Sequence, residues 1–307
     1  MSLVEYRLDG VYDKEQHAIE TLQAFVPEEG YYVAFSGGKD SVCVKALCDL
    51  AGVKYDAHYR VTSVDPPELV RFIRKAYPDV EFSYPRYPDG KRINMWNLIV
   101  KKRVPPTRFG RYCCMYLKED GGKGRMTVTG VRWAESAKRR MTHGIVDVHS
   151  EDAPDYFDSN NRGGRILNND NDEAREFLES CYRLKKTVIN PIIDWEDEDV
   201  WEFIHKHNIP YCELYDQGYN RLGCIGCPLA GHQRMKEGFQ KYPKYKKAYT
   251  LAFQRMIDKR IQDGIPTETW KSGEEVMEWW LEEIDTSPKP LEGQIALDLE
   301  EIQKEMM

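Results

Sequence analysis

The sequence of 307 residues predicts an α/β fold, in which a doubly wound, mostly parallel sheet is followed by a helical C-terminal cap. Short apolar runs alternate with helical patterns through the first two-thirds of the chain, which is typical of βαβ units. A glycine-rich turn at 36–41 joins the first buried run directly to a helix. Residues 231–307 keep only the helical spacing. We therefore expect an α/β domain at 1–230 and a helical region at 231–307.

Each expected element follows from the spacing of its apolar residues. The run at 31–35 is typical of a buried strand, and in the next helix Val44, Leu47 and Leu50 share one face. Residues 148–172 are polar and rich in Asn, Asp and Gly, so a surface loop or a lid is expected there. The expected strands are 31–35, 55–61, 80–84 and 125–131, order resumes at 187–191, and the expected helices are 13–25, 40–50, 67–76, 134–141, 196–207, 245–261 and 276–284.

Composition limits the class of protein. Hydrophobic residues make up 41% of the chain, and no run reaches the roughly 18 apolar residues of a transmembrane helix. Residues 1–10 lack the features of a secretory signal, so a cytoplasmic protein without a membrane partner is expected. The 44 Lys and Arg against 51 Asp and Glu give a net charge of −7. This balance disfavours nucleic-acid binding as the main role, except through a local basic patch or a partner subunit.

The strongest short motif is Ser36-Gly37-Gly38-Lys39-Asp40-Ser41, between the first buried strand and its helix. Two glycines let the backbone turn tightly so that its N–H groups face an anion, and the helix N-terminus adds further donors. Lys39 supplies a cation, while Ser36 and Ser41 supply hydroxyl groups. The hexapeptide predicts a cradle for pyrophosphate, and it differs from a Walker A loop, which has the pattern GxxxxGK[ST].

Eight cysteines are too few for a disulfide scaffold at this length, and clustered pairs are more typical of metal ligands or catalytic thiols. The two pairs are Cys113-Cys114 and Cys224-Ile225-Gly226-Cys227, whose thiolates suit zinc or an iron–sulfur cluster. Because neighbouring side chains diverge, adjacent cysteines fit a cubane with four irons better than a single zinc ion. A [4Fe–4S] cluster is therefore expected, with zinc or no metal as alternatives. Cys43 and Cys48 are expected in the core, and Cys212 is a candidate persulfide carrier or spare ligand.

The hexapeptide resembles the PP-loop of the ATP pyrophosphatase superfamily, which is adenine nucleotide alpha hydrolase-like and cleaves ATP between the α- and β-phosphates. A CC pair followed far downstream by CxxC resembles the cluster-binding pattern of adenylylsulfate reductases. Further segments resemble the phosphoadenosine phosphosulfate (PAPS) reductase family, so that the likeness covers about residues 30–232. These segments are Gly130-Val131-Arg132-Trp133-Ala134-Glu135-Ser136-Ala137-Lys138-Arg139, Asn190-Pro191-Ile192-Ile193-Asp194-Trp195 and residues 209–219.

The resemblance implies a Rossmann-like sheet that binds ATP with Mg²⁺, and catalytic roles for Lys39, Asp40 and Arg132. Arg132 and Arg139 suit this role because guanidinium groups match tetrahedral oxyanions, although a solvated basic helix face would show the same spacing. Asp65 lies in a stretch, 63–68, that matches the family only in part. The nucleotide-binding residues implied are Ser36, Gly37, Gly38, Lys39, Asp40, Ser41, Asp65, Arg132, Glu135, Ser136 and Arg139, and the implied metal ligands are Cys113, Cys114, Cys224 and Cys227.

The chain departs from the reductases in two ways. It has no cysteine after Cys227, whereas sulfonucleotide reductases attack sulfur with a cysteine near the C-terminus, and its phosphate loop is intact where theirs is degraded. Both departures favour ATP cleavage to AMP and pyrophosphate, which activates an acceptor for sulfur transfer as in sulfur-inserting relatives. The alternatives are a reductase-like enzyme on a sulfonucleotide, a non-catalytic nucleotide sensor with a structural metal, and a sulfate adenylyltransferase.

The expected partners follow from that function. They are an adenine nucleotide, a sulfur donor such as a cysteine desulfurase, and an acceptor whose identity the sequence leaves open. Trp270, Trp279 and Trp280 are expected in the cap core or in a contact between copies of the chain. The run 241–247 alternates Lys with Tyr. It fits a solvated helix start better than a nucleic-acid contact.

Overall fold

The computed structural model describes residues 3–8, 10–108, 110–119, 121–149, 164–166, 186–267 and 270–282. Its strands are β1 (Val4–Arg7), β2 (Gly10–Asp13), β3 (Tyr31–Ala34), β4 (Tyr55–Arg60), β5 (Glu81–Ser83), β6 (Thr127–Val128), β7 (Val146–His149), β8 (Gly164–Ile166) and β9 (Lys186–Ile189). Its α-helices are α1 (Lys14–Ala24), α2 (Lys39–Ala51), α3 (Pro67–Ala76), α4 (Met95–Lys102), α5 (Tyr112–Cys114), α6 (Ala137–Thr142), α8 (Asp197–Lys206), α9 (His232–Lys241), α10 (Pro243–Gln262) and α11 (Gly273–Leu281). Short π or 3₁₀ turns are η1 (Met115–Glu119), η2 (Trp133–Glu135) and η3 (Pro228–Ala230).

The main sheet confirms the predicted α/β class. Its strand order is β5-β4-β3-β6-β9-β7-β8, and the neighbours from β5 to β9 pair in parallel. Strand β7 pairs antiparallel with both β9 and β8. Strands β4 and β5 extend the sheet to one side of β3, while β6 and β9 extend it to the other. Open α/β sheets bind ligands at such a reversal, beyond the carboxyl ends of the strands.

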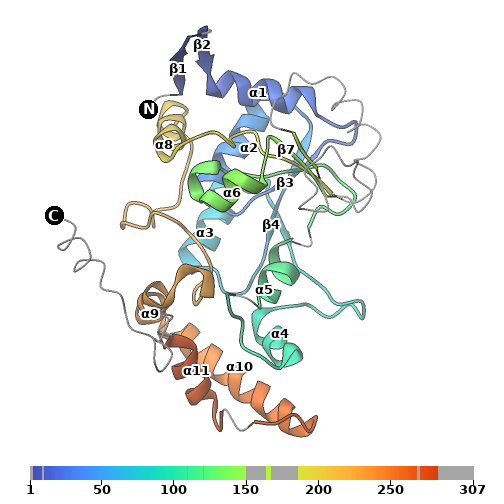
Figure 1. Cartoon of the computed structure of the whole chain (residues 1–307), viewed down its shortest axis with the longest axis vertical. Coiled ribbons are helices and arrows are strands. Elements are labelled where there is room, and N and C mark those ends of the chain that lie inside the picture. The colour runs from blue at the N-terminus through green and yellow to red at the C-terminus, as the bar shows by residue number, and fades with distance from the viewer. Residues whose placement is uncertain are drawn as a thin grey trace, which may run out of the picture.

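Two hydrophobic cores lie along the long axis of the molecule (Figure 1). The first joins the main sheet to α1, α2, α3 and α8, and Cys43, Cys48 and Cys212 are buried in it as small apolar side chains. The second joins α9, α10 and α11 to α4, η1 and the apolar residue Ile225. The cap is therefore helical as expected, and its core also takes residues from before position 230. The division of the chain at 230 stays a prediction.

Several elements differ from the sequence-based expectation. The β1–β2 hairpin, α4 and the α5–η1 turn were not expected, because these short elements lack a long periodic pattern. The expected strand at 125–131 is reduced to β6, and the helix expected at 134–141 divides into η2 and α6. The backbone leaves β6 early because Gly130 packs against Asp40, where an added Cβ would lie 2.9 Å from the Asp40 carbonyl carbon.

Other sequence-based expectations concern segments that the structure describes only in part or not at all. The loop expected at 148–172 is wrong where the structure describes it, because residues 148–149 end β7 and residues 164–166 form β8, which pairs with β7. The rest of that segment lies outside the described residues, as do Cys181 and residues 283–307. Within the described ranges, no helix combines the length and apolar character that crossing a membrane requires.

Candidate functional site

The glycine-rich loop joins β3 to α2, as the sequence predicts. Gly38 is the N-cap of α2 and offers no side chain to the first N–H groups of the helix, which therefore face the loop. Gly37 has a φ of +75°, and a Cβ there would lie 2.7 Å from Ile73 of α3. Only glycine fits this combination of positive φ and close packing. The turn is consequently fixed against α3 and has the features of an anion cradle.

The two serines of the loop bond to each other and to the turn. The Ser41 hydroxyl donates to the Gly38 carbonyl at 2.9 Å, and the Ser36 backbone N–H donates to Ser41 Oγ at 3.2 Å. The first N–H of α2, from Lys39, donates to the hydroxyl oxygen of Tyr215 at 2.8 Å. Tyr215 was not expected at this site: it lies in the segment 209–219 that resembles the family, but that resemblance implied no role for this residue.

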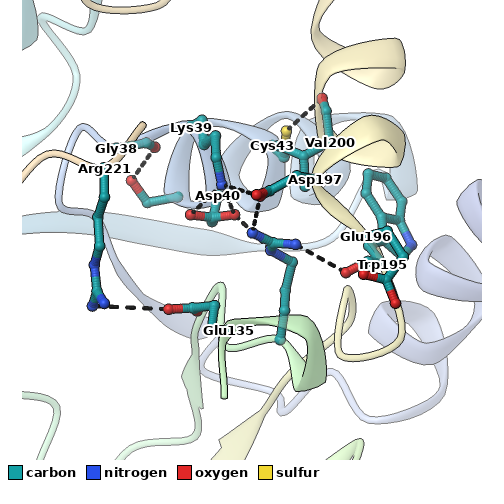
Figure 2. Close-up of polar contacts among 12 residues, drawn as sticks. Gly38, Lys39, Asp40, Cys43, Glu135, Trp195, Glu196, Asp197, Val200 and Arg221 are labelled. Atoms are coloured by element: carbon teal, nitrogen blue, oxygen red, sulfur yellow. Dashed lines mark hydrogen bonds and ion pairs between the residues drawn. The ribbon is translucent and has the colours of Figure 1, made fainter. Parts of the chain in front are cut away.

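The side chains of Lys39, Asp40 and Asp197 converge (Figure 2), and Arg132 joins them in one network of charges. Both cations are buried, whereas Asp40 is half-buried and Asp197 is exposed. The Lys39 ammonium lies 3.0 Å from Asp40 Oδ1 and 2.8 Å from Asp197 Oδ1. The Arg132 guanidinium donates to Asp40 at 2.7 Å, to Asp197 at 2.6 Å and to the Trp195 carbonyl at 3.0 Å. Two cations therefore face two carboxylates. The structure brings together the three residues predicted as catalytic and adds Asp197, which the sequence reasoning missed.

Burial and the neighbouring charges shift the pKa values of this network in opposite directions. Lys39 and Arg132 are 5% and 2% exposed. Burial opposes ionisation of Arg132, yet the Asp40 and Asp197 carboxylates hold its pKa above the ordinary value. Burial likewise opposes ionisation of Asp197, and hydrogen bonds from Lys39 and Arg132 hold its pKa below the ordinary value. The acidic first turn of α8 is the one signal in the sequence that marks Asp197.

Glu135, Ser136 and Arg139 lie on η2 and α6, next to this network. Ser136 is the N-cap of α6 and accepts a hydrogen bond from the Arg139 N–H at 3.2 Å. Glu135 pairs with Arg139 and lies 3.8 Å from Arg221, as Figure 2 shows for Arg221. Burial lowers the pKa of Arg139 from its ordinary value. A half-buried arginine near an open loop is a suitable donor for an anion.

A cavity of about 230 Å³ opens beside the loop, over the carboxyl ends of β3 and β4. Ser36 lines it on the loop side, while Asp65 and Lys118 line it on the side of the cysteines. Two of its aromatic side chains, Tyr32 and His58, stack with ring centres 4.3 Å apart. The cavity therefore connects the phosphate loop with the cysteine region at the reversal of strand order.

Asp65 is buried and fully engaged by neighbouring side chains. It accepts hydrogen bonds from the hydroxyls of Tyr59 at 2.5 Å and Thr62 at 2.7 Å. The Cys224 thiol lies 3.5 Å from its other carboxylate oxygen. The structure thus places Asp65 between the cavity and the cysteines, away from the Lys39 network.

The two cysteine pairs are held by the second core. Cys113 and Cys114 form α5, and Cys224 and Cys227 bound a turn that precedes η3. The Ile225 N–H donates to the Val64 carbonyl at 2.8 Å, which ties this turn to the loop after β4. Gly226, in the middle of the turn, has a φ of +70°, and a Cβ there would lie 2.6 Å from Phe239. The C-terminal helices therefore determine the position of the CxxC turn.

The thiols and Lys118 share one electrostatic environment. Burial raises the pKa of Cys224 to about 12. A hydrogen bond from Cys113, with the charges of Lys118 and Arg111, lowers the pKa of Cys114 to about 6. The charge interaction with Cys224 raises the pKa of Lys118. Cationic groups that offset thiolate charge are typical of metal and cluster sites.

The donor chemistry of the cysteine region fits an iron–sulfur cluster or zinc, since four thiols and a balancing ammonium lie close enough to influence one another. In the described ranges, however, no three His, Cys, Asp or Glu side chains have a metal-binding arrangement. Metal binding by Cys113, Cys114, Cys224 and Cys227 therefore stays a prediction. Cys212 is fully buried in the first core, which does not suit an accessible persulfide carrier.

Known proteins resemble this chain in sequence. The uncharacterized protein MJ0973 of Methanocaldococcus jannaschii is 25% identical over 211 residues, which cover 69% of this chain and 44% of that protein. Adenosine 5'-phosphosulfate reductase of Oceanobacillus iheyensis is 44% identical over 52 residues, or 17% of this chain and 22% of the enzyme. The chain therefore covers less than half the length of these curated relatives.

Solved structures with a similar arrangement have low sequence identity to this chain. The phosphoadenylyl-sulfate (PAPS) reductase of Candida auris, in a phosphate complex, is 16% identical with a TM-score of 0.43, covering 67% of this chain and 87% of that one. The FMN adenylyltransferase of Candida glabrata, with FMN and an ATP analogue, is 16% identical with a TM-score of 0.39, covering 69% of this chain and 64% of the other.

The family assignment depends on the match over the sheet and both cysteine pairs. Residues 30–230 match the model of the phosphoadenosine phosphosulfate reductase domain. This range contains the glycine-rich loop, the Lys39 network and the CxxC turn, and it makes up more than half of the chain. The chain therefore belongs to the phosphoadenosine phosphosulfate reductase domain family.

Proposed function

We propose that this protein binds Mg-ATP at the glycine-rich loop and cleaves it to AMP and pyrophosphate, in order to activate an acceptor for sulfur transfer. The observation that carries the proposal is the intact loop, with Lys39 and Arg132 beside it and a cavity that leads to the cysteine pairs. A glycine-rich loop at a helix N-terminus, with an adjacent ammonium, suits the phosphates of an intact triphosphate.

The charge network supplies the groups for the first step. Lys39 turns from Asp197 toward the phosphates, and the two carboxylates of Asp40 and Asp197 are suitable ligands for Mg²⁺. An acceptor oxygen attacks the α-phosphorus, the bond to the bridging oxygen breaks, and pyrophosphate leaves with the electron pair. Arg132, already fixed by the Trp195 carbonyl, holds Asp40 in place while the charge on the phosphates develops.

The second step takes place on the side of the cavity that faces the cysteines. Sulfide displaces AMP from the activated acceptor, so that the carbon–oxygen or phosphorus–oxygen bond breaks and AMP carries the oxygen away. We propose Cys113, Cys114, Cys224 and Cys227 as ligands of a [4Fe–4S] cluster, with zinc as the alternative. A bound cluster would supply a binding place for sulfide, while Lys118 and Arg111 balance the thiolate charge. A cysteine desulfurase is a suitable sulfur donor, and a cytoplasmic location fits this chemistry.

The runner-up is a reductase-like reaction on a sulfonucleotide. The short matches to adenosine 5'-phosphosulfate reductases, which are 39–48% identical over 42–55 residues, favour it. The intact phosphate loop at 36–41, in place of the degraded loop of such reductases, disfavours it. Release of sulfite from adenosine 5'-phosphosulfate, without cleavage of ATP, would select this alternative.

Nucleotide binding tests the first part of the proposal. Calorimetric titration with a non-hydrolysable ATP analogue and Mg²⁺ should give a saturable isotherm with the wild-type chain and a much weaker one with Lys39→Ala. Lys54→Ala is the matched control, because Lys54 is exposed and lies outside the site. Equal affinity of all three proteins would reject the loop as the nucleotide site.

A further inference from the structure

The net charge of −7 is distributed very unevenly along this chain. Residues 84–118 contain nine Lys or Arg and one Asp, a net charge of +8. Residues 232–262, which form α9 and α10, contain nine Lys or Arg and two acidic residues, a net charge of +7. The remaining residues therefore carry −22. Because α4 and α10 pack together in the second core, both basic segments lie in the same part of the molecule.

A hollow of about 580 Å³ lies between α4 and α10, and basic side chains surround it. Arg103 and Lys259 share the carboxylate of Asp263, at 2.5 and 2.6 Å. Lys101 and Arg255 are exposed, and in the described ranges neither forms an ion pair with a carboxylate. Four cations thus line the hollow, and among the described residues their ion pairs involve a single carboxylate, that of Asp263. An excess of this kind attracts a polyanion.

The acidic helix α11 does not neutralise this face. Gly273, at its start, packs against Thr250 and Gln254 of α10. Gln254 and Arg255 are adjacent in the helix, so their side chains point about 100° apart at 3.6 residues per turn. Helix α11 therefore covers a different side of α10 from the one that carries Arg255 and Lys259.

Aromatic rings accompany the cations along the same segment. The Lys101 ammonium lies 3.6 Å from the centre of the Tyr87 ring, Arg92 lies 4.2 Å from that of Tyr84, and Lys102 lies 4.5 Å from that of Tyr116. Trp96 lines the hollow itself and is half-buried. Aromatic faces interleaved with cations bind single-stranded nucleic acids, because the rings stack on bases while the cations contact phosphates.

The hollow is linked to the cysteine pairs by direct contacts. The rings of Trp96 and Tyr249 meet edge to face, 5.1 Å apart. The Tyr249 hydroxyl donates to the carbonyl of Ile225, within the CxxC turn, at 3.1 Å. On the other side, Lys102 donates to the Tyr116 hydroxyl at 3.1 Å, and Tyr116 follows α5 by two residues. A strand bound in the hollow would therefore lie beside the part of the molecule that carries the thiols.

We infer that the α4–α10 hollow binds a single-stranded segment of nucleic acid, which makes nucleic acid the class of acceptor for sulfur. The role as acceptor rests on the proposed sulfur-transfer function, whereas binding itself does not. A small metabolite would need neither two basic segments nor the aromatic side chains that accompany their cations. The overall negative charge, which disfavours nucleic-acid binding from composition alone, resides outside this face.

Fluorescence anisotropy without ATP tests the binding surface. The probes are labelled single strands of RNA and DNA of about 20 nucleotides, somewhat longer than the roughly 4–16 nucleotides of typical single-strand sites, and an abasic strand of equal length. The test variant is Lys101→Ala with Arg255→Ala. The matched control is Lys54→Ala with Lys75→Ala, which removes two exposed cations from the surface around the main sheet. Salt is varied between about 50 and 200 mM.

At least one base-containing strand should bind the wild-type chain at least fivefold more tightly than its abasic counterpart, since stacking contributes about 1–3 kcal/mol per base. The test variant should bind the strand at least tenfold more weakly. The slope of log affinity against log salt concentration should become shallower by about 1.4, which is about 0.7 for each of two lost phosphate contacts. The control should bind within twofold of wild type.

Two results would overturn the inference. The first is equal affinity for the abasic and the base-containing strands, which indicates a general polyanion site. The second is an affinity of the test variant equal to that of the wild-type chain. ATP binding by the test variant should stay at the wild-type value, which separates this surface from the nucleotide site. If strands bind as expected while ATP is never cleaved, the binding surface stands and the proposed sulfur-transfer function fails.

Discussion

The ammonium of Lys39 lies 2.8 Å from the carboxylate of Asp197, so the cation of the phosphate loop is paired with a carboxylate of its own chain. Asp197 also accepts from Arg132 at 2.6 Å, and both cations share Asp40 as a second partner. The phosphates of a nucleotide have to compete with Asp197 for Lys39. This competition makes the network a determinant of nucleotide affinity and gives the first prediction.

Replacement of Asp197 by Asn should tighten binding of an ATP analogue measured without Mg²⁺ by about twofold to fivefold. The gain corresponds to a partly exposed ion pair of about 0.3–1 kcal/mol, which the phosphates no longer displace. Calorimetric titration of wild type and variant measures the change. Weaker binding of the metal-free analogue would show that Asp197 supports the nucleotide directly and would contradict the competition.

Lys39→Ala should weaken Mg-ATP binding by about tenfold to hundredfold, because a charged hydrogen bond to phosphate contributes about 1.5–3 kcal/mol. Iron and sulfide content should stay at the wild-type level, since Lys39 does not contact the cysteine pairs. Metal analysis of the same sample supplies the second readout. A joint loss of nucleotide binding and metal would indicate general unfolding.

Cys113→Ser and Cys227→Ser should each remove the brown colour, iron and sulfide of anaerobically purified protein, while ATP binding remains. The reason is that each thiolate is one of four proposed ligands. Cys48→Ala is the control, because Cys48 is buried in α2 and should leave iron unchanged. Full iron content in both serine variants would remove the four-cysteine assignment.

The ion pair of Asp56 with Arg125, which lies outside the candidate site, should make the stability of the fold depend on pH. Hydrogen bonds from Arg125, at 2.5 and 2.7 Å, hold the pKa of Asp56 below its ordinary value of about 3.9. The unfolded chain binds this proton more readily, so the contribution to stability is present above about pH 4 and is lost as pH falls through the lower folded pKa.

Urea unfolding from pH 7 to 3 measures this contribution. Asp56→Asn should be less stable than wild type at pH 7, and the difference should shrink as the pH falls. A difference that grows on acidification would contradict the stated direction of the shift.

Gly226→Ala should destabilise the protein by about 1–3 kcal/mol, because its φ of +70° is strained for alanine and the new Cβ meets Phe239 at 2.6 Å. It should also lower the iron content, since the CxxC turn moves. Gly223→Ala is the matched control: a Cβ there has no heavy atom within 4 Å, and its φ is not positive. Thermal unfolding with metal analysis compares them, and equal behaviour would show that the turn tolerates a side chain.

Much of the first core could be predicted from the sequence. Helix α3 begins and ends where its apolar spacing and Pro67 indicate, and β3, α2 and β4 lie within about one or two residues of their expected bounds. These elements have long periodic patterns or a motif at their boundary. The short helix α4 and strand β6 depend on tertiary contacts, such as Gly130 against Asp40, that local spacing does not record.

The site was predictable in part for the same reason. The residues of the hexapeptide and Arg132 lie together as expected, because they belong to contiguous motifs. Asp197 and Tyr215 complete the site from distant segments, and a polar side chain in a helix start or a loop does not reveal its partner. The basic hollow shows the same difference, since the two charged segments meet only when α4 packs on α10.

The central claim is cleavage of ATP at the loop by a protein that carries a thiolate-bound metal. The most direct measurement is anaerobic purification with iron and sulfide analysis, followed by incubation with Mg-ATP and each candidate strand, and separation of the nucleotide products. We predict about four iron and four sulfide per chain, the content of a [4Fe–4S] cluster, with AMP and pyrophosphate released in equal amounts. Zinc without sulfide, or bound ATP that yields no AMP, would contradict it.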